Sequence, residues 1–281
     1  MVIPQEMSNY GENTVVFSEI PLRDNISPAG EDFSKGDMIA AEGIVIDAAA
    51  AACICSSGTE KVTVYERIKA ALISTGNELK YPGEALEYGQ IYNSNLMYIR
   101  SRLAELGCEE ASHIHARDNE EEIAGALHDG AKNADIIITT GGVSVGKRDL
   151  LEEAVKMAGG EVLFHGIRIK PGAPTMYSIL NGIPVLSLSG NPFAARCMFE
   201  MLNPFKRPVA TEAVLINEIK KERPLKRLVP GIWDGMRVTL SDSDKSGSTL
   251  GSVGSNCIVE LPEGKEALKP GSKVRIYLIL K

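Results

Sequence analysis

The sequence lacks any run that approaches the roughly 20 consecutive apolar residues of a membrane-spanning helix. Its first residues, MVIPQEMSNYGEN, also lack the basic and then apolar layout of a secretory signal peptide. Positive charge is not in excess, because 30 Lys and Arg stand against 37 Asp and Glu, a net charge of -7. We therefore expect a cytoplasmic protein that uses neither nucleic acid nor a membrane, and that gathers anionic ligands with glycine backbones, helix ends and a few cations.

Cysteine is also scarce, with five residues in a chain of 281. An odd number without the spacing of a disulfide framework favours reduced thiols. Cys53 and Cys55 form a C-x-C pair in an Ala-rich run, but no second Cys or His pair lies nearby. We therefore interpret them as small buried side chains rather than metal ligands.

What the sequence does contain falls into three blocks. Residues 1–67 are irregular, with one short apolar helix expected near 46–57 and too few apolar partners to close a core. Residues 68–206 alternate strands with helices, which predicts an α/β fold: three layers around a mostly parallel sheet. Residues 207–281 consist of short strands divided by Gly, Asp and Ser, which predicts a small all-β domain, a sandwich or a partial barrel.

Periodicity places the elements of the middle block. The apolar run 68–75 suits a central strand. The next segment has apolar residues at helical spacing, Asn93 or Ser94 as its cap, and Gly107 as its stop. Further elements are expected as a strand at 109–116, a helix at 119–133, a strand at 134–140, a helix at 148–159, a strand near 162–164, a hairpin at 175–189 that turns at Asn181-Gly182, and a helix opened by Asn191-Pro192.

A glycine-rich loop lies in ITTGGVSVGKRDLL, residues 138–151. Gly141 to Lys147 reads as G-x-x-x-x-G-K, but Arg148 stands where a P-loop needs Ser or Thr to hold magnesium. The loop follows a strand and precedes a helix, so its backbone N–H groups and the helix dipole favour an anion in any case. We predict an anion-binding loop rather than a nucleotide P-loop, with a plain tight turn as the alternative.

Three carboxylates, Glu78, Asp118 and Asp149, each come just after an expected strand. Alone, each is typical of a helix cap or a solvated loop. Together at the carboxyl edge of one sheet they predict a shared site, with carboxylates on magnesium and Arg168 and Lys170 on an oxyanion.

His113 and His115 share one face of a strand, which suits a metal. Since no third ligand is in view, ordinary strand histidines are the preferred interpretation.

In their order along the chain, several motifs resemble the molybdopterin molybdenumtransferase family, which is related to the E domain of gephyrin. The resemblance covers essentially the whole chain and rests on GEDFSKGD, ALISTGNEL, GQIYNSN, TTGGVSVG, IKPGAP, SGNPFAA, and a C-terminal block with LPEG and a closing G-x-x-V strand.

This resemblance implies a molybdopterin-binding α/β domain at 68–206 and a β-barrel-like domain at 207–281. Residues 1–67 would be the remnant of elongated, dimerising N-terminal domains. It also implies a reaction, the insertion of molybdate into the dithiolene of adenylylated molybdopterin with Mg²⁺-dependent release of AMP. The partners implied are a second copy of the chain and either an upstream molybdopterin adenylyltransferase or a separate N-terminal polypeptide.

The family's functional residues carry over by motif position. The acidic residues are Asp32, Glu78, Asp118 and Asp149, the last three also as magnesium ligands. The residues matched to cofactor binding are Thr140, Gly141, Gly142, Ser144, Gly146, Lys170, Pro171, Gly190 and Asn191.

The chain also departs from the family. Members begin further upstream, with a part that lends residues to the partner's active site, so an N-terminally truncated member is expected. Ala173 stands where the K-P-G-K-P turn has its second lysine, and Lys147 stands where an acidic residue is frequent. The alternative is therefore a truncated paralogue that binds molybdopterin without inserting metal. A related nucleotide-processing enzyme is a weaker third hypothesis, against which the all-β block argues.

Overall fold

The computed structural model describes residues 1–20, 25–143, 149–220, 222–241, 249–264 and 266–279. The chain divides into two compact units, Met1–Tyr65 and Glu66–Lys281. Among the described residues, no helix is both long and apolar enough to cross a membrane.

The first unit has little regular structure. A 3-10 turn, η1 (Gln5–Met7), leads into the antiparallel pair β1 (Ser8–Tyr10) and β2 (Val15–Phe17), and α1 (Ala48–Ser56) follows with Asp47 as its N-cap. The expected apolar helix is thus confirmed, but none of its residues is buried. The interpretation of Cys53 and Cys55 as buried is wrong, because one is half-buried and the other exposed on a helix that this unit does not cover. All five cysteines are free thiols, as expected.

The second unit is built on a six-stranded sheet with the order β6-β3-β7-β11-β10-β8. Its first four strands pair in parallel, and β10 runs antiparallel to both of its neighbours. The strands are β3 (Lys69–Thr75), β6 (Glu109–Ala116), β7 (Ile136–Thr140), β8 (Glu161–His165), β10 (Met176–Leu180) and β11 (Ile183–Leu188). The predicted mostly parallel sheet is confirmed.

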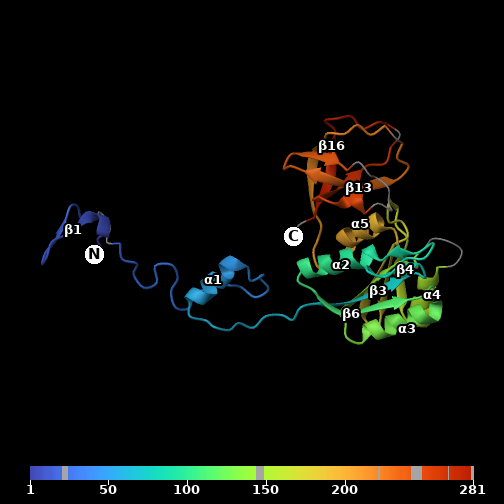
Figure 1. Cartoon of the computed structure of the whole chain (residues 1–281), viewed down its shortest axis with the longest axis horizontal. Helices are drawn as coiled ribbons and strands as arrows, with labels where there is room; N and C mark the ends of the chain where they lie inside the picture. The colour runs from blue at the N-terminus through green and yellow to red at the C-terminus, as the bar shows by residue number, and fades with distance from the viewer. Residues whose placement is uncertain (21–24, 144–148, 221, 242–248, 265, 280–281) are drawn as a thin grey trace. The chain divides into compact units, whose positions relative to one another are not determined.

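Helices cover both faces of this sheet (Figure 1). The helices α2 (Ser94–Glu105) and α5 (Pro192–Leu202) pack on one face with Leu72 and Ile138. The helices α3 (Glu120–Ala131) and α4 (Leu150–Met157) pack on the other face with Ile73 and Ile137. Because alternate residues of β3 and β7 point into two cores, these strands are mostly apolar, and the expected three layers are confirmed.

Local signals in the sequence end the elements as expected. Asn93 caps α2 by accepting a hydrogen bond from the Leu96 N–H at 3.1 Å, and Gly107 follows the helix with φ +76°. The β10–β11 hairpin turns at Asn181 and Gly182, with φ of 51° and 81°, the left-handed pair that a two-residue turn requires.

One small sheet was not anticipated. Between β3 and α2, the strands β4 (Leu79–Lys80) and β5 (Ile91–Tyr92) pair in parallel. The segment 76–92, called the 76–92 excursion below, leaves the main sheet between β3 and α2. The short β4–β5 ladder holds it beside the carboxyl end of β3.

The C-terminal strands form a closed sheet, because β14 pairs with both β12 and β13. They are β12 (Val209–Leu215), β13 (Lys226–Trp233), β14 (Arg237–Leu240), β15 (Cys257–Leu261) and β16 (Lys273–Leu278), with a 3-10 turn, η2 (Leu250–Ser252), between β14 and β15. The expected barrel-like β domain is confirmed. The short strand β9 (Ile169–Lys170) leaves the α/β part and pairs with the start of β13, which joins the two parts within one unit.

Candidate functional site

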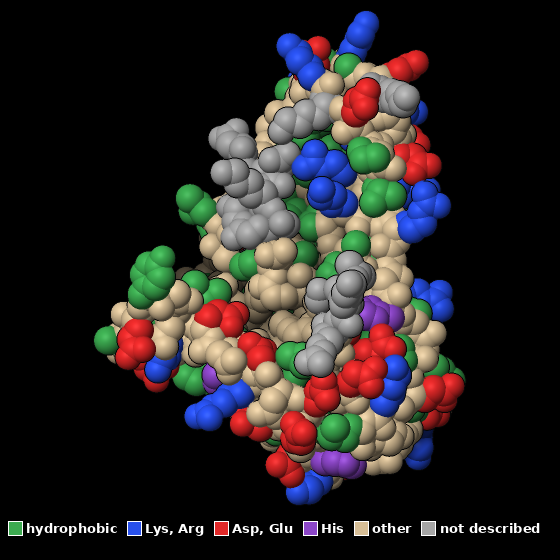
Figure 2. Space-filling view, turned by 90° about the vertical axis from the view of Figure 1, so that its right-hand side faces the viewer, with side chains coloured by type: hydrophobic (Ala, Val, Ile, Leu, Met, Phe, Trp, Pro, Cys, Tyr) green, Lys and Arg blue, Asp and Glu red, His purple; other side chains and the backbone are tan. Residues whose placement is uncertain are grey.

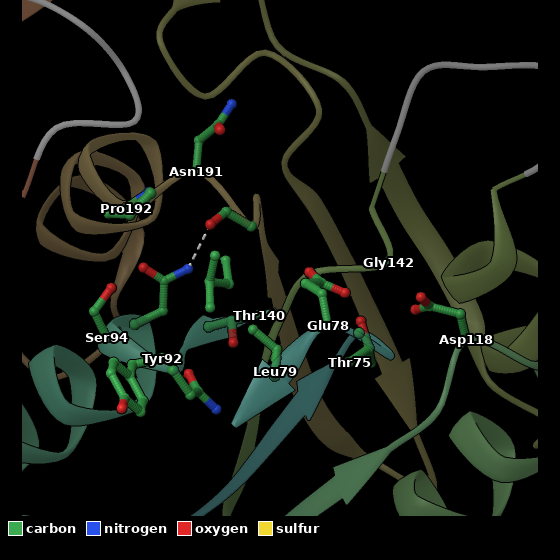
Figure 3. Close-up of a pocket in the computed structure, with 16 residues that line it drawn as sticks. Thr75, Glu78, Leu79, Tyr92, Ser94, Asp118, Thr140, Gly142, Asn191 and Pro192 are labelled. Carbon is green, nitrogen blue, oxygen red and sulfur yellow. Dashed lines mark hydrogen bonds between the residues drawn. The ribbon is translucent and has the colours of Figure 1, made fainter. Parts of the chain in front are cut away.

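A cavity of about 440 Å³ opens at the carboxyl end of the parallel strands (Figure 3). This is the edge at which ligands bind in open α/β sheets. Its walls come from the loops after β3, β6, β7 and β11 and from the starts of α2 and α5. The lining residues are Thr75, Gly76, Glu78, Leu79, Ile91, Tyr92, Asn93, Ser94, Asn95, Asp118, Thr140, Gly141, Gly142, Gly190, Asn191 and Pro192.

Many of the residues singled out from the sequence meet in this pocket. They are Glu78, Asp118, Thr140, Gly141, Gly142, Gly190 and Asn191. They come from four separate loops, so it is the parallel sheet that brings them together.

The floor of the pocket is a close crossing of two loops. Gly141 and Gly142 have φ of +88° and +65°, and a Cβ on Gly141 would lie 2.4 Å from the Thr75 carbonyl oxygen. The Cα of Gly141 is also 3.7 Å from the place where a Cβ of Gly190 would stand. Only glycine combines these φ values with so close an approach, which explains the glycine pair at this turn.

Beneath this turn lies a hydroxyl without a hydrogen-bond partner. Thr75 is 2% exposed, and its Oγ1 has no partner among the described residues. It lies 2.8 Å from where a Cβ of Gly142 would stand. A buried hydroxyl in this state is a polar group that a ligand or a water in the pocket can satisfy.

One wall of the pocket carries two carboxylates. Both oxygens of Glu78 lie against the Cα of Gly76, and Asp118 is tied to Asn77 by two reciprocal bonds. The Asn77 N–H donates to Asp118 Oδ2 at 3.2 Å, and the Asp118 N–H donates to Asn77 Oδ1 at 3.4 Å. The loops after β3 and β6 are therefore locked together, and both carboxylates belong to that locked pair.

The opposite wall consists of two helix N-termini (Figure 3). The helices α2 and α5 begin at Ser94 and Pro192, and the Asn95 side chain bridges them by donating to the Gly190 carbonyl at 2.8 Å. Helix N-termini carry partial positive charge and attract anions. No Lys or Arg is among the described lining residues. The wall with Glu78 and Asp118 is therefore negative, and the wall formed by the two helix N-termini is weakly positive through its backbone dipoles. Figure 2 shows one face of the protein with a hollow whose lower rim carries several Asp and Glu side chains.

Asp149 does not line this pocket. Its Oδ1 accepts hydrogen bonds from the Leu151 and Glu152 N–H groups, each at 3.1 Å, so Asp149 caps α4. Its Oδ2 lies 3.2 Å from His165 Nε2, and His165 Nδ1 lies 2.8 Å from a Glu152 oxygen. The structure therefore does not bring Asp149 to Glu78 and Asp118. The described residues contain no group of three or more His, Cys, Asp or Glu that could hold a metal ion.

Lys170 and Pro171 lie outside the lining of the pocket. Lys170 is exposed in β9, where its register partner across the sheet is Arg227 of β13. Arg168 is exposed just before β9. Arg227 was not predicted from the sequence, because its place beside Lys170 depends on a strand pairing between the α/β part and the β domain.

Two expectations concern residues elsewhere. Asp32 is exposed and belongs to the first unit. Ser144 and Gly146 of the glycine loop, with Lys147 and Arg148, lie outside the described residues.

The strand histidines contact the 76–92 excursion. His113 Nε2 lies 3.3 Å from the Tyr81 hydroxyl, and the Tyr81 ring packs edge-on against both His113 and His115. Burial, then the charge of Arg100, lowers the pKa of His113. His115 Nε2 lies 2.9 Å from the Gly76 carbonyl oxygen.

Comparison with known proteins gives matches along most of the chain. Residues 71–208 match the family model of the probable molybdopterin binding domain, and residues 212–279 match that of the MoeA C-terminal region (domain IV). The molybdopterin molybdenumtransferase of Staphylococcus aureus (strain MSSA476) is 33% identical over 269 residues, which is 91% of this chain and 64% of that protein. The enzyme of the same name from Bacillus subtilis (strain 168) is 31% identical over 288 residues, 96% of this chain and 67% of that protein.

Solved structures agree with these matches. The crystal structure of the molybdopterin biosynthesis MoeA protein from Pyrococcus horikosii superposes with a TM-score of 0.79 at 26% identity, covering 100% of this chain and 72% of that one. The chain thus spans 64% of the length of the Staphylococcus aureus relative and about two thirds of the Bacillus subtilis one.

Proposed function

This chain belongs to the molybdopterin molybdenumtransferase family, and on that premise we propose that it inserts molybdate into adenylylated molybdopterin, with Mg²⁺-dependent release of AMP. The observation that carries the proposal is the pocket at the carboxyl edge of the sheet. It lies within the segment that matches the molybdopterin-binding domain, and it sets Glu78 and Asp118 opposite two helix N-termini.

The two walls suit the two ends of a pterin phosphate. Backbone N–H groups at the starts of α2 and α5 are the lining groups best suited to a phosphate, because no lining side chain carries positive charge among the described residues. The turn at Gly141-Gly142 allows the ligand to approach the backbone, and the Thr75 hydroxyl below it supplies a further hydrogen bond.

Magnesium fits the carboxylate wall. Mg²⁺ is usually held by one or two carboxylates together with substrate phosphates and water, and Glu78 and Asp118 supply such a pair of oxygen donors. When bound, the ion would neutralise charge that develops on the pyrophosphate as AMP leaves. In this proposal Glu78 and Asp118 hold the ion, Asn77 holds Asp118 in place, and Asp149 fixes the start of α4.

Molybdate, as the substrate oxyanion, needs positive charge. We assign this role to Lys170, with Pro171 beside it and Arg227 as its neighbour across the β9–β13 pair. The same proposal includes a homodimer, in which Asp32 of the first unit would serve a neighbouring site. Sedimentation measures whether the dimer forms.

Reconstitution with the full chain tests the proposal. The purified protein is mixed with adenylylated molybdopterin, molybdate and Mg²⁺, and AMP release is measured together with activation of a molybdenum-free apoenzyme. Both signals are expected. Binding of the pterin without AMP release would favour the alternative, a paralogue that binds molybdopterin but does not insert metal. Absence of binding would contradict both.

A further inference from the structure

A side chain of the edge strand of the sheet contacts the carbonyl group of Gly76. His115, on the edge strand β6, places its Nε2 2.9 Å from the Gly76 carbonyl oxygen. A carbonyl only accepts, so Nε2 must carry the proton of this bond. The Tyr81 ring packs edge-on against the same imidazole, with 6.5 Å between ring centroids, which brings a second point of the 76–92 excursion to β6.

Gly76 is also in close contact with the Glu78 side chain. Gly76 has a φ of +142°, and both Glu78 oxygens lie within 2.8 Å of the place where its Cβ would stand, so a rotation of this peptide would move the backbone against which the carboxylate lies. The Leu79 N–H turns back to the same carbonyl at 3.4 Å. The position of Glu78 therefore depends on a carbonyl that a β6 side chain holds.

The second carboxylate comes from the same strand. Asp118 follows β6 by two residues and is bound to Asn77, the residue between Gly76 and Glu78. His115 and Asp118 thus contact two consecutive residues of the neighbouring loop, Gly76 and Asn77.

We infer that His115 is a positioning residue: its bond to the Gly76 carbonyl ties the Glu78 loop to the strand that presents Asp118, and so sets the spacing of the two carboxylates. That the two carboxylates hold a divalent cation rests on the proposed function. The hydrogen bond between His115 and the Gly76 carbonyl is independent of that function. The neutral tautomer with a proton on Nε2 and the imidazolium both donate to the carbonyl, so this contact persists when the imidazole is protonated.

Two substitutions separate the donor from the shape of the side chain. His115→Gln keeps an N–H that can donate to the carbonyl, whereas His115→Phe keeps a ring and removes the donor. His128→Gln is the matched control, because His128 is exposed on α3, away from the residues that line the pocket. Thermal unfolding of each full-length variant verifies that it folds.

The primary measurement is amide hydrogen exchange of the peptide that covers residues 76–80, since the Asn77 N–H donates to Asp118 and the Leu79 N–H to the Gly76 carbonyl. Loss of one hydrogen bond is expected to speed their exchange roughly fivefold in His115→Phe. His115→Gln and His128→Gln are expected to stay within roughly twofold of the wild type. Unchanged exchange in His115→Phe would overturn the inference, as would equal acceleration in His115→Gln.

Mn²⁺ binding, followed by electron paramagnetic resonance, is the second measurement. If the wild type binds Mn²⁺, His115→Phe is expected to bind it at least roughly threefold more weakly and His115→Gln nearly normally. Equal affinity in the wild type and His115→Phe would overturn the claim that His115 sets the carboxylates. A wild type that binds no Mn²⁺ would contradict the magnesium role in the proposed function, while the exchange result still decides whether His115 holds the loop.

Discussion

The carboxylate of Glu78 lies against the Cα of Gly76, so that a Cβ at position 76 would stand 2.6 Å from Oε2 and 2.8 Å from Oε1. The glycine therefore does more than permit a turn. It leaves the space into which the acidic side chain folds, and that side chain lines the pocket.

Gly76→Ala is expected to destabilise the protein by about 1–3 kcal/mol, because the φ of +142° is strained for an L side chain and the methyl group would displace Glu78. Chemical denaturation measures the change. Gly125→Ala is the control, since Gly125 lies inside α3 with open space around it and is expected to gain about 0.5–1 kcal/mol. A neutral Gly76→Ala would show that the Glu78 loop is not fixed.

Glu78→Gln and Asp118→Asn are each expected to abolish Mg²⁺-dependent AMP release while changing the free energy of unfolding by less than about 0.5 kcal/mol, because both side chains are exposed. Turnover assays and denaturation curves are compared with those of Glu121→Gln, an exposed glutamate on α3. Retention of full turnover by either pocket variant would remove that residue from the site.

Asp149→Ala is expected to destabilise the protein by about 1 kcal/mol, because the side chain caps α4 through two backbone N–H groups. Asp149→Asn keeps a capping oxygen and is expected to retain most of that stability. If Asp149→Ala is instead as stable as the wild type and has lost turnover, then Asp149 acts on the substrate directly.

The stability of the fold is expected to decline in mild acid through His113. Its folded pKa lies below the ordinary value of about 6.5, so between the two values the unfolded chain binds the proton more readily. The stabilisation is full above about pH 6.5 and is lost as the pH falls toward the lowered pKa. Arg100, Glu110 and His115 act on this imidazole through their charges, and the Tyr81 hydroxyl contacts it. The Tm of the wild type minus that of His113→Gln is expected to shrink from pH 7.5 to pH 5; parallel curves would contradict this assignment.

The elements that local patterns determine were predictable from the sequence. Asn93 and Gly107 mark the ends of α2, and Asn181-Gly182 marks the hairpin, because capping and turn geometry depend on neighbouring residues alone. The meeting of Glu78 and Asp118 also followed, since carboxyl ends of parallel strands share one edge.

Features that depend on tertiary contacts were not predictable. The pairing of β9 with β13, which sets Lys170 beside Arg227, joins segments more than fifty residues apart. Asp149 was expected beside Glu78 and Asp118 because all three follow strands. The structure shows it instead as the cap of α4, next to His165, whose position at the end of β8 gave no distinct signal.

We propose above all that the pocket binds molybdopterin with the help of a divalent cation on Glu78 and Asp118. Isothermal titration of the full chain with molybdopterin, with and without Mg²⁺, tests it most directly, with the double variant Glu78→Gln/Asp118→Asn alongside. The wild type is expected to bind, and more tightly with Mg²⁺, whereas the double variant is expected to lose the Mg²⁺ effect. A wild type with no affinity for molybdopterin or its adenylate under either condition would contradict the account.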